Sequence, residues 1–212
     1  MRIIAGTARG RTIKAPEGRG TRPITDRAKE AIFNMLVSLG GVDDAVVFDL
    51  FAGSGSFGLE SLSRGAAHVT FVESDRNALR TLEGNLATLG FAERATILSM
   101  PVERAIQTIG HADIAFCDPP YRLDIWETLL AGIDADLIVG HAERPIALTD
   151  RWVEERRRSY GRAKIVIASL AAGSIEVTGS LEVGASLEVG GSLDSSSTPD
   201  DAVASEVDRS DE

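Results

Sequence analysis

Cysteine and histidine are scarce in this chain of 212 residues. Cys117 has no second cysteine to pair with, which excludes an internal disulfide, and the spacing of the three histidines matches no metal-ligand motif. We therefore expect no bound metal and a small buried thiol at Cys117. The chain also lacks a run of about 18 apolar residues, and its first residues lack the apolar segment of a signal peptide. These absences favour a cytoplasmic protein that does not enter a membrane.

Charge is distributed unevenly along the sequence. Most of the acidic excess behind the net charge of −10 falls within residues 171–212, where ten acidic side chains stand against Arg209. The same segment contains three weak repeats with a period of six residues. Three such repeats cannot build the core of a β-solenoid, so we expect residues 171–212 to form a disordered acidic tail.

The N-terminal end is basic. Residues 1–29 carry eight Lys and Arg side chains against Glu17 and Asp26, and this excess favours a polyanionic partner whose phosphates it can neutralise. Glycine and proline interrupt the short strand-like runs of this segment. Residues 1–24 are therefore expected to form a β-hairpin extension that lies outside the core and helps to bind that partner.

Between these ends, residues 25–170 alternate between strand-like and helix-like patterns. Repeated β–α units predict an α/β fold in which helices cover both faces of a parallel sheet. Gly161 separates the last two strand-like runs and leaves no room for a crossover helix, so these two runs should pair antiparallel at one edge. The expected helices begin at Thr25 or Asp26 and at residues 56, 75, 102 and 125, and the expected strands are 46–50, 69–73, 96–98, 113–117, 137–139, 152–160 and 163–170.

A glycine-rich loop follows the first strand. Gly53-x-Gly55-x-x-Gly58 matches the dinucleotide fingerprint, and Glu73 ends the second strand, where a ribose-binding acid belongs. An NAD-dependent oxidoreductase is therefore one interpretation. Asp49 argues against it, because a carboxylate at this strand end repels a pyrophosphate but suits a ligand that carries an amine and a sulfonium. S-adenosylmethionine is such a ligand.

With this cofactor, the contacts are expected to come from the ends of three strands. Asp49 would hold the methionine amino group, directly or through water, and Glu73 would accept the two ribose hydroxyls. Met100, after the third strand, would border the adenine through its backbone or by packing. The candidate cofactor-binding residues are Asp49, Ala52, Gly53, Ser54, Gly55, Glu73, Ser74 and Met100.

The fourth strand leads into Asp118-Pro119-Pro120-Tyr121. A carboxylate and a backbone carbonyl can accept both N–H bonds of an exocyclic amine while the aromatic ring stacks on its base, and prolines fix the direction of their carbonyls. These hydrogen bonds would favour a pyramidal, more nucleophilic nitrogen aligned for attack on a methyl group. The four residues are the candidate catalytic site, and a target base inside a helix would have to be flipped out to reach it.

These motifs, together with the arm Arg2-Ile-Ile-Ala-Gly6 and the segment from Arg22 to Arg27, resemble the RsmD-type family of methyltransferases over residues 1–170. The resemblance implies a class I S-adenosylmethionine-dependent methyltransferase fold, Rossmann-like, with a seven-stranded mixed sheet and an antiparallel edge hairpin. It implies methyl transfer to N2 of a guanine in 16S rRNA, within a 30S assembly intermediate. The arm would then bind RNA, and we expect a monomer. Candidate phosphate contacts are Arg9, Arg11, Arg22 and Arg27, and Thr25 would line the pocket or cap the helix.

Two features depart from the family pattern. Met100 stands where a polar residue is usual, and residues 140–143, after the fifth strand, are unfamiliar. DNA adenine-N6 methylation is the nearest alternative function, because Asp-Pro-Pro-Tyr also serves that chemistry, but the chain offers no separate DNA-recognition domain. A non-catalytic RNA-binding assembly factor also remains open, and it predicts RNA affinity without methyl transfer.

Overall fold

The computed structural model describes residues 1–15 and 24–172, and helices and strands alternate along most of this range. The elements are α1 (Asp26–Val37), β1 (Val46–Leu50), α2 (Ser56–Ser63), β2 (His68–Glu73), α3 (Arg76–Leu89), the 3-10 helix η1 (Ala92–Arg94), β3 (Ala95–Ser99), α4 (Val102–Ala105), β4 (Ala112–Cys117), α5 (Trp126–Gly132), β5 (Ala135–Ala142), β6 (Trp152–Tyr160) and β7 (Ala163–Leu170).

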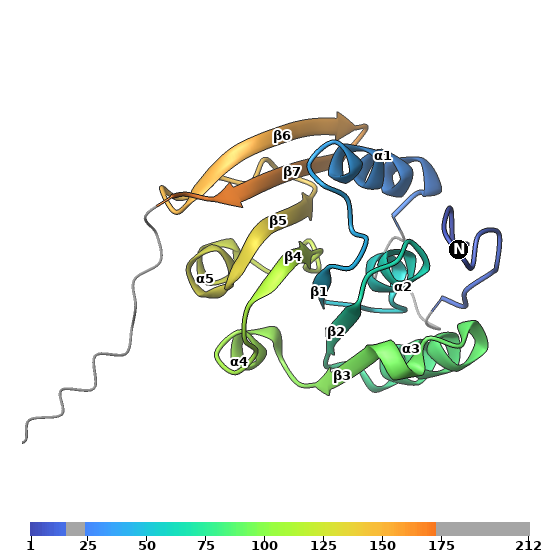
Figure 1. Cartoon of the computed structure of the whole chain (residues 1–212). Helices are drawn as coiled ribbons and strands as arrows, with labels where there is room; N and C mark the ends of the chain where they lie inside the picture. The colour runs from blue at the N-terminus through green and yellow to red at the C-terminus, as the bar shows by residue number, and fades with distance from the viewer. Residues whose placement is uncertain (16–23, 173–212) are drawn as a thin grey trace, which may run out of the picture. The chain divides into compact units, whose positions relative to one another are not determined.

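The strands form one seven-stranded sheet in the order β3-β2-β1-β4-β5-β7-β6 (Figure 1). Strands β1 to β5 pair in parallel, whereas β7 pairs antiparallel with both β5 and β6. The mixed sheet and its antiparallel edge pair are thus as the sequence predicts. Strand β5 is longer than expected and extends to Ala142, while α4 ends at Ala105 and continues only as turns.

Helix ends follow local capping chemistry. Thr25 Oγ1 accepts a hydrogen bond of 3.2 Å from the Ala28 N–H, so Thr25 and not Asp26 caps α1. The Asp75 carboxylate accepts from two backbone N–H groups at the start of α3, and Gly90 ends that helix with a φ of 75°. None of the helices in the described part of the chain is long and apolar enough to cross a bilayer.

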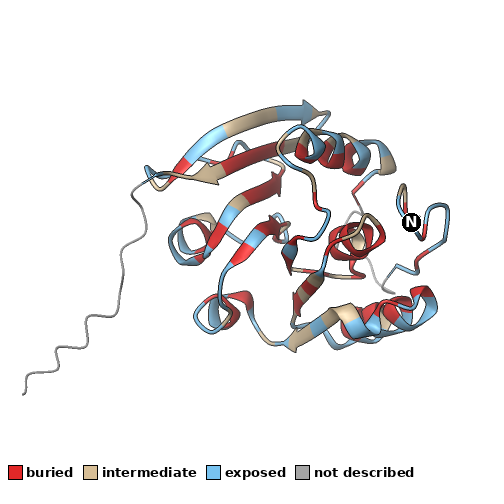
Figure 2. Ribbon diagram, in the orientation of Figure 1, coloured by how far each residue is buried: buried red, intermediate tan, exposed pale blue. Residues whose placement is uncertain are grey.

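Apolar side chains pack against both faces of the sheet. One cluster joins the sheet to α1, α2 and α3, and a second joins it to α4 and α5. Phe116 of β4 is central to the first cluster, where its ring stacks on Phe57 at 4.9 Å. Figure 2 shows the buried residues on the faces where helices and strands meet. Cys117 is 1% exposed and burial raises the pKa of its thiol, which confirms its expected role as a small core residue.

The N-terminal segment agrees with its expectation only in part, because residues 1–3 and 10–13 do pair antiparallel through backbone hydrogen bonds. One antiparallel bridge, between Arg2 and Thr12, takes the place of regular strands. Ile3, Ala8 and Ile13 are buried in the cluster that joins the sheet to α1, α2 and α3, so the prediction that this segment lies outside the core is wrong. Burying each isoleucine contributes about 1.5–3 kcal/mol, which favours docking over projection into solvent. Residues 16–23 and all but the first two residues of the expected acidic tail lie outside the described ranges.

Hydrogen bonds also fix this N-terminal segment to α2 and α3. The N–H groups of Ile4 and Ala5 donate to the Glu60 carboxylate of α2 at 2.8 and 3.0 Å. Asn85 of α3 exchanges two hydrogen bonds with the backbone of Lys14, at 2.9 and 3.0 Å. The first fifteen residues are therefore part of the folded body.

Candidate functional site

Three candidate carboxylates lie at the carboxyl end of the sheet. The chain runs from β1 outward through β2 and β3 and then crosses back to β4 on the other side of β1. The carboxyl ends of β1 and β4 therefore form the switch point where open α/β sheets bind ligands. The register places Asp49 of β1 between Phe71 of β2 and Phe116 of β4. Glu73 and Asp118 lie two residues beyond those partners, so all three carboxylates are on one face of the sheet.

Asp49 is 1% exposed, and its Oδ2 accepts a hydrogen bond of 2.8 Å from the N–H of Gly58. Burial is the main cause that raises the pKa of Asp49 to about 8. The charges of Asp118 and Glu73 add to this rise, and the Gly58 hydrogen bond opposes it. The carboxylate ties the end of β1 to the first turn of α2. Sequence reasoning missed this structural contact, which comes in addition to the expected contact with a ligand amine.

The loop after β1 has an unusual backbone. Phe51 has a φ of 66°, a left-handed conformation that costs about 1–3 kcal/mol in a residue with a side chain. A Cβ at Gly58 would lie 2.2 Å from the Phe71 ring, so Gly58 is needed for α2 to pack on β2. A Cβ at Gly53, where φ is 57°, would meet no protein heavy atom within 4 Å. Gly53 therefore leaves an open approach to the loop backbone, whereas Gly58 serves internal packing.

Glu73 organises the backbone around itself. Its Oε2 accepts a hydrogen bond of 2.8 Å from the Gly53 N–H, and its Oε1 accepts from the N–H groups of Ser74 and Asp75 at 2.7 and 2.8 Å. The side chain thus joins the glycine loop to the start of α3. Each carboxylate oxygen has two lone pairs, so Oε2 retains the capacity to accept a ribose hydroxyl.

The remaining candidate cofactor residues surround the same strand ends. Ala52 is buried, and its N–H donates to the Val72 carbonyl at 3.0 Å. Ser54 is also buried, and its carbonyl accepts a hydrogen bond of 3.0 Å from Asn85. Met100 is half-buried after β3, against the cluster with α4 and α5. Gly55 is buried at the start of α2 and Ser74 is exposed at the end of β2.

The Asp118 carboxylate is hydrogen-bonded to a histidine. Its Oδ1 lies 2.8 Å from Nδ1 of His141 on β5, and the two side chains are 30% and 3% exposed. The Tyr121 ring is 6.2 Å from the His141 ring, edge-on, and Tyr121 is 44% exposed. Pro119 is buried and Pro120 is exposed between them. His141 was absent from the candidates, although the expected pairing of the fourth and fifth strands could have indicated that it lies beside Asp118.

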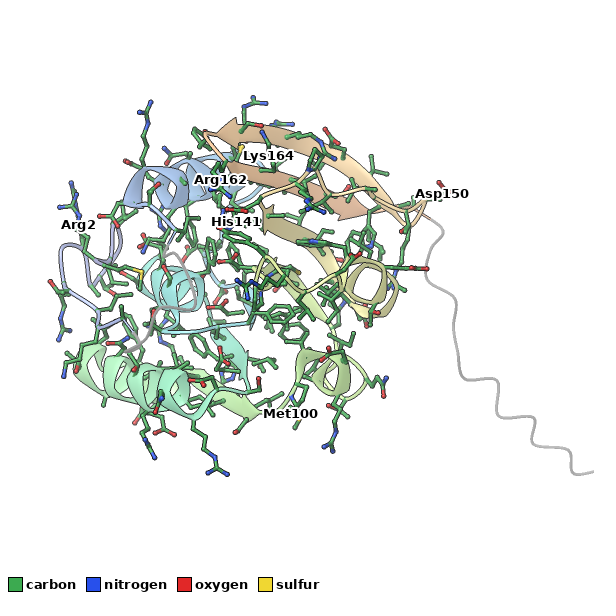
Figure 3. All side chains as sticks on the ribbon, turned by 180° about the vertical axis from the view of Figure 1, so that it is seen from behind. Arg2, Met100, His141, Asp150, Arg162 and Lys164 are labelled. Atoms are coloured by element: carbon green, nitrogen blue, oxygen red, sulfur yellow. The ribbon has the colours of Figure 1, made fainter. Side chains whose placement is uncertain are left out.

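A cleft of about 300 Å³ opens beside this pair. It lies between the start of α1, the loop after β4, the end of β5 and the turn from β6 to β7. Its lining includes Thr25, Tyr121, His141, Tyr160 and Arg162, and Figure 3 shows His141 and Arg162 in this region. Two tyrosines and a histidine give the cleft flat surfaces on which a planar ring can stack.

The candidate RNA-binding arginines are in different environments. Arg9 and Arg27 are exposed. Arg11 donates hydrogen bonds to the carbonyls of Thr88 and Leu89 at the end of α3, so its guanidinium also anchors the N-terminal segment. Arg22 lies outside the described residues.

Known proteins resemble both the sequence and the fold. The model of the family described as conserved hypothetical protein 95 matches residues 1–168. The Bacillus subtilis protein YlbH, named as a candidate rRNA methyltransferase, is 36% identical over 181 residues, which cover 79% of this chain and 97% of YlbH. Ribosomal RNA small subunit methyltransferase D of Escherichia coli K12 is 42% identical over 127 residues, which cover 60% of this chain and 63% of that protein.

A solved structure extends the comparison to three dimensions. The Escherichia coli protein yhhF, described as a candidate methyltransferase, superposes with a TM-score of 0.71 and 35% identity, over 80% of this chain and 97% of that one. The expected class I S-adenosylmethionine-dependent methyltransferase fold is therefore confirmed. Because the family match spans most of the sequence and includes the N-terminal arm, the chain belongs to the conserved hypothetical protein 95 family, the RsmD-type methyltransferases.

Proposed function

We propose that this protein transfers a methyl group from S-adenosylmethionine to the exocyclic N2 amine of a guanine in 16S rRNA, within a 30S assembly intermediate. The observation that carries the proposal is the arrangement of Asp49, Glu73 and Asp118 at one edge of the sheet, beside Tyr121. Membership in a family with relatives named as methyltransferases of small-subunit ribosomal RNA supports the choice of substrate.

The charge of this edge suits the cofactor, which supplies the methyl group. Asp118 and Glu73 are close enough to raise the pKa of Asp49, so the edge concentrates negative charge. A ligand with an ammonium and a sulfonium relieves this repulsion, whereas the pyrophosphate of NAD would add to it. Glu73 accepts a ribose hydroxyl through Oε2, and the open backbone at Gly53 passes along the ligand.

The acceptor amine lies at Asp118. One oxygen of its carboxylate and the carbonyl of Pro119 accept the two N–H bonds of the amine, which turns the nitrogen lone pair toward the methyl group. The base enters the cleft and stacks on Tyr121. The methylated amine is acidic while it carries the extra proton and releases it readily, so Asp118 acts by orientation and hydrogen bonding rather than as a strong base.

RNA reaches the site as a flipped or unpaired base, because an amine inside a helix cannot enter the cleft. Arg9 and Arg27 are exposed and contact phosphates of the RNA. Arg11 holds the N-terminal segment against the end of α3.

Methyl transfer from labelled S-adenosylmethionine tests the proposal. Purified unmodified 30S particles and free 16S rRNA are the acceptors, and the product is hydrolysed to nucleosides. We expect N2-methylguanosine from the wild-type protein and none from Asp118→Ala, whose cofactor affinity should stay within a few-fold of wild type. N6-methyladenosine would favour the adenine alternative, and RNA binding without transfer by the wild type would favour an assembly factor.

A further inference from the structure

His141 and Asp118 occupy matching positions on neighbouring strands. Cys117 of β4 pairs with Gly140 of β5 in parallel register, and the next residue along each strand is Asp118 or His141. Phe116 and Val139, which lie two residues before Asp118 and His141, also pair with each other and are buried in the cluster that joins the sheet to α1, α2 and α3. Since side chains alternate between the two faces of a sheet, Asp118 and His141 point to that same face.

The hydrogen bond between them fixes the direction of the carboxylate. An ionised carboxylate has no proton to donate, so Nδ1 of His141 carries the hydrogen in the 2.8 Å contact with Oδ1. The His141 ring is 3% exposed on a central strand, and its freedom is small, whereas Asp118 begins a loop. His141 therefore determines how the Asp118 carboxylate is oriented.

We propose that His141 is a positioning residue for methyl transfer. It holds Oδ1 of Asp118 and leaves Oδ2 to accept an N–H bond of the acceptor amine. This inference rests on the proposed function, because it assigns Asp118 to the acceptor. His141 also lines the cleft, where its ring edge meets Tyr121, so the same side chain orients the hydrogen-bond acceptor and borders the base.

The chain contains a matched control. His111 Nδ1 lies 3.0 Å from Asp134 Oδ1, and these side chains are 49% and 59% exposed. His111 precedes β4, so this pair lies at the amino end of the sheet, opposite Asp118. The two histidine–aspartate pairs have similar Nδ1–Oδ1 distances and differ in burial and in place, and Nε2 of His111 also lies 3.4 Å from Oδ1 of Asp136.

Steady-state methyl transfer to 30S particles by four variants tests the inference. We expect His141→Ala to lower kcat by about 10–100-fold, because a misplaced reacting group loses on the order of 100-fold, with the KM for S-adenosylmethionine within about two-fold of wild type. His141→Asn should recover most of the rate, because its amide N–H lies where Nδ1–H lies in histidine. His141→Gln places its amide one bond farther away and should not recover the rate. His111→Ala should match the wild type.

Each variant is compared at a temperature well below its own melting temperature, so that a loss of stability is separated from a loss of rate. The inference is overturned if His141→Ala has the wild-type kcat, or if Asn and Gln give equal rates. A wild-type protein that transfers no methyl group would instead overturn the proposed function. If His141→Ala does not fold, the inference is tested by the difference in kcat between His141→Asn and His141→Gln.

Discussion

Glu60 Oε2 lies 3.4 Å from Nζ of Lys29, and neither side chain is more than 1% exposed. Glu60 also accepts from Arg64 Nε at 2.8 Å and from two backbone N–H groups of the N-terminal segment. Lys29 donates to the Arg2 carbonyl at 2.9 Å. Burial lowers the pKa of Lys29 although Glu60 opposes this shift. Two buried charges are thus compensated by contacts that join α1, α2 and the first residues of the chain.

We expect the two members of this pair to differ in their effect on stability. Glu60→Ala leaves Lys29 without its counter-ion and two backbone N–H groups without an acceptor, and should lower the free energy of unfolding by about 3–5 kcal/mol. Lys29→Met should cost less, about 1–3 kcal/mol, because Glu60 keeps Arg64 and the backbone donors. Urea unfolding measures both values. If both substitutions lowered the free energy of unfolding equally, the view that Glu60 contributes more contacts than Lys29 would be contradicted.

Asp49 predicts a pH dependence of stability. Its pKa rises from an ordinary value of 3.8 to about 8 on folding, so between these values the folded protein holds a proton that the unfolded chain has released. Raising the pH through this interval therefore destabilises the wild type through Asp49. Asp49→Asn has no proton to lose there and can still accept from Gly58. Its melting temperature relative to wild type should increase from pH 5 to pH 8 and level off above about pH 9. A difference that does not change with pH would show that Asp49 is ionised throughout.

Two glycines should respond oppositely to alanine. Gly58→Ala forces a Cβ into the Phe71 ring and should cost about 1–3 kcal/mol. Gly84 is exposed in the middle of α3, and a Cβ added there would meet no heavy atom within 4 Å, so Gly84→Ala should gain about 0.5–1 kcal/mol. Thermal unfolding of both variants checks the prediction. A neutral Gly58→Ala would mean that α2 moves away from β2 at little cost.

Arg9 and Arg11 should separate RNA binding from folding. Arg9→Ala removes an exposed cation, and we expect weaker binding to 16S rRNA, a salt-dependence slope smaller by about 1, and an unchanged melting temperature. Arg11→Ala also removes the hydrogen bonds to the end of α3 and should lower the melting temperature. Titrations at several salt concentrations give the slope. An unchanged slope for Arg9→Ala would remove Arg9 from the RNA surface.

Periodicity and turn residues were enough to predict the sheet. The strands at residues 46–50, 152–160 and 163–170 have the expected bounds, because apolar alternation and Gly161 are local signals. The position of the N-terminal segment was not predictable in the same way. Ile3 and Ile13 are buried by packing against helices that are distant in the sequence. The buried role of Glu60 depends on its contact with Ile4, 56 residues away, so its position in a helix does not reveal that role. The Asp118 motif was found from its own residues, whereas its partner His141 depends on strand register, which no short segment encodes.

Asn85 also has a consequence for the order of events during synthesis. Its side chain binds the backbone of Lys14, 71 residues earlier, and the carbonyl of Ser54. Residues 1–15 are synthesised before the sheet and α3, so they cannot dock until those elements have been made, and Ile3 and Ile13 have no apolar surface to cover them until then. This segment is therefore fixed late, in the same step in which Asn85 completes the support of the glycine loop.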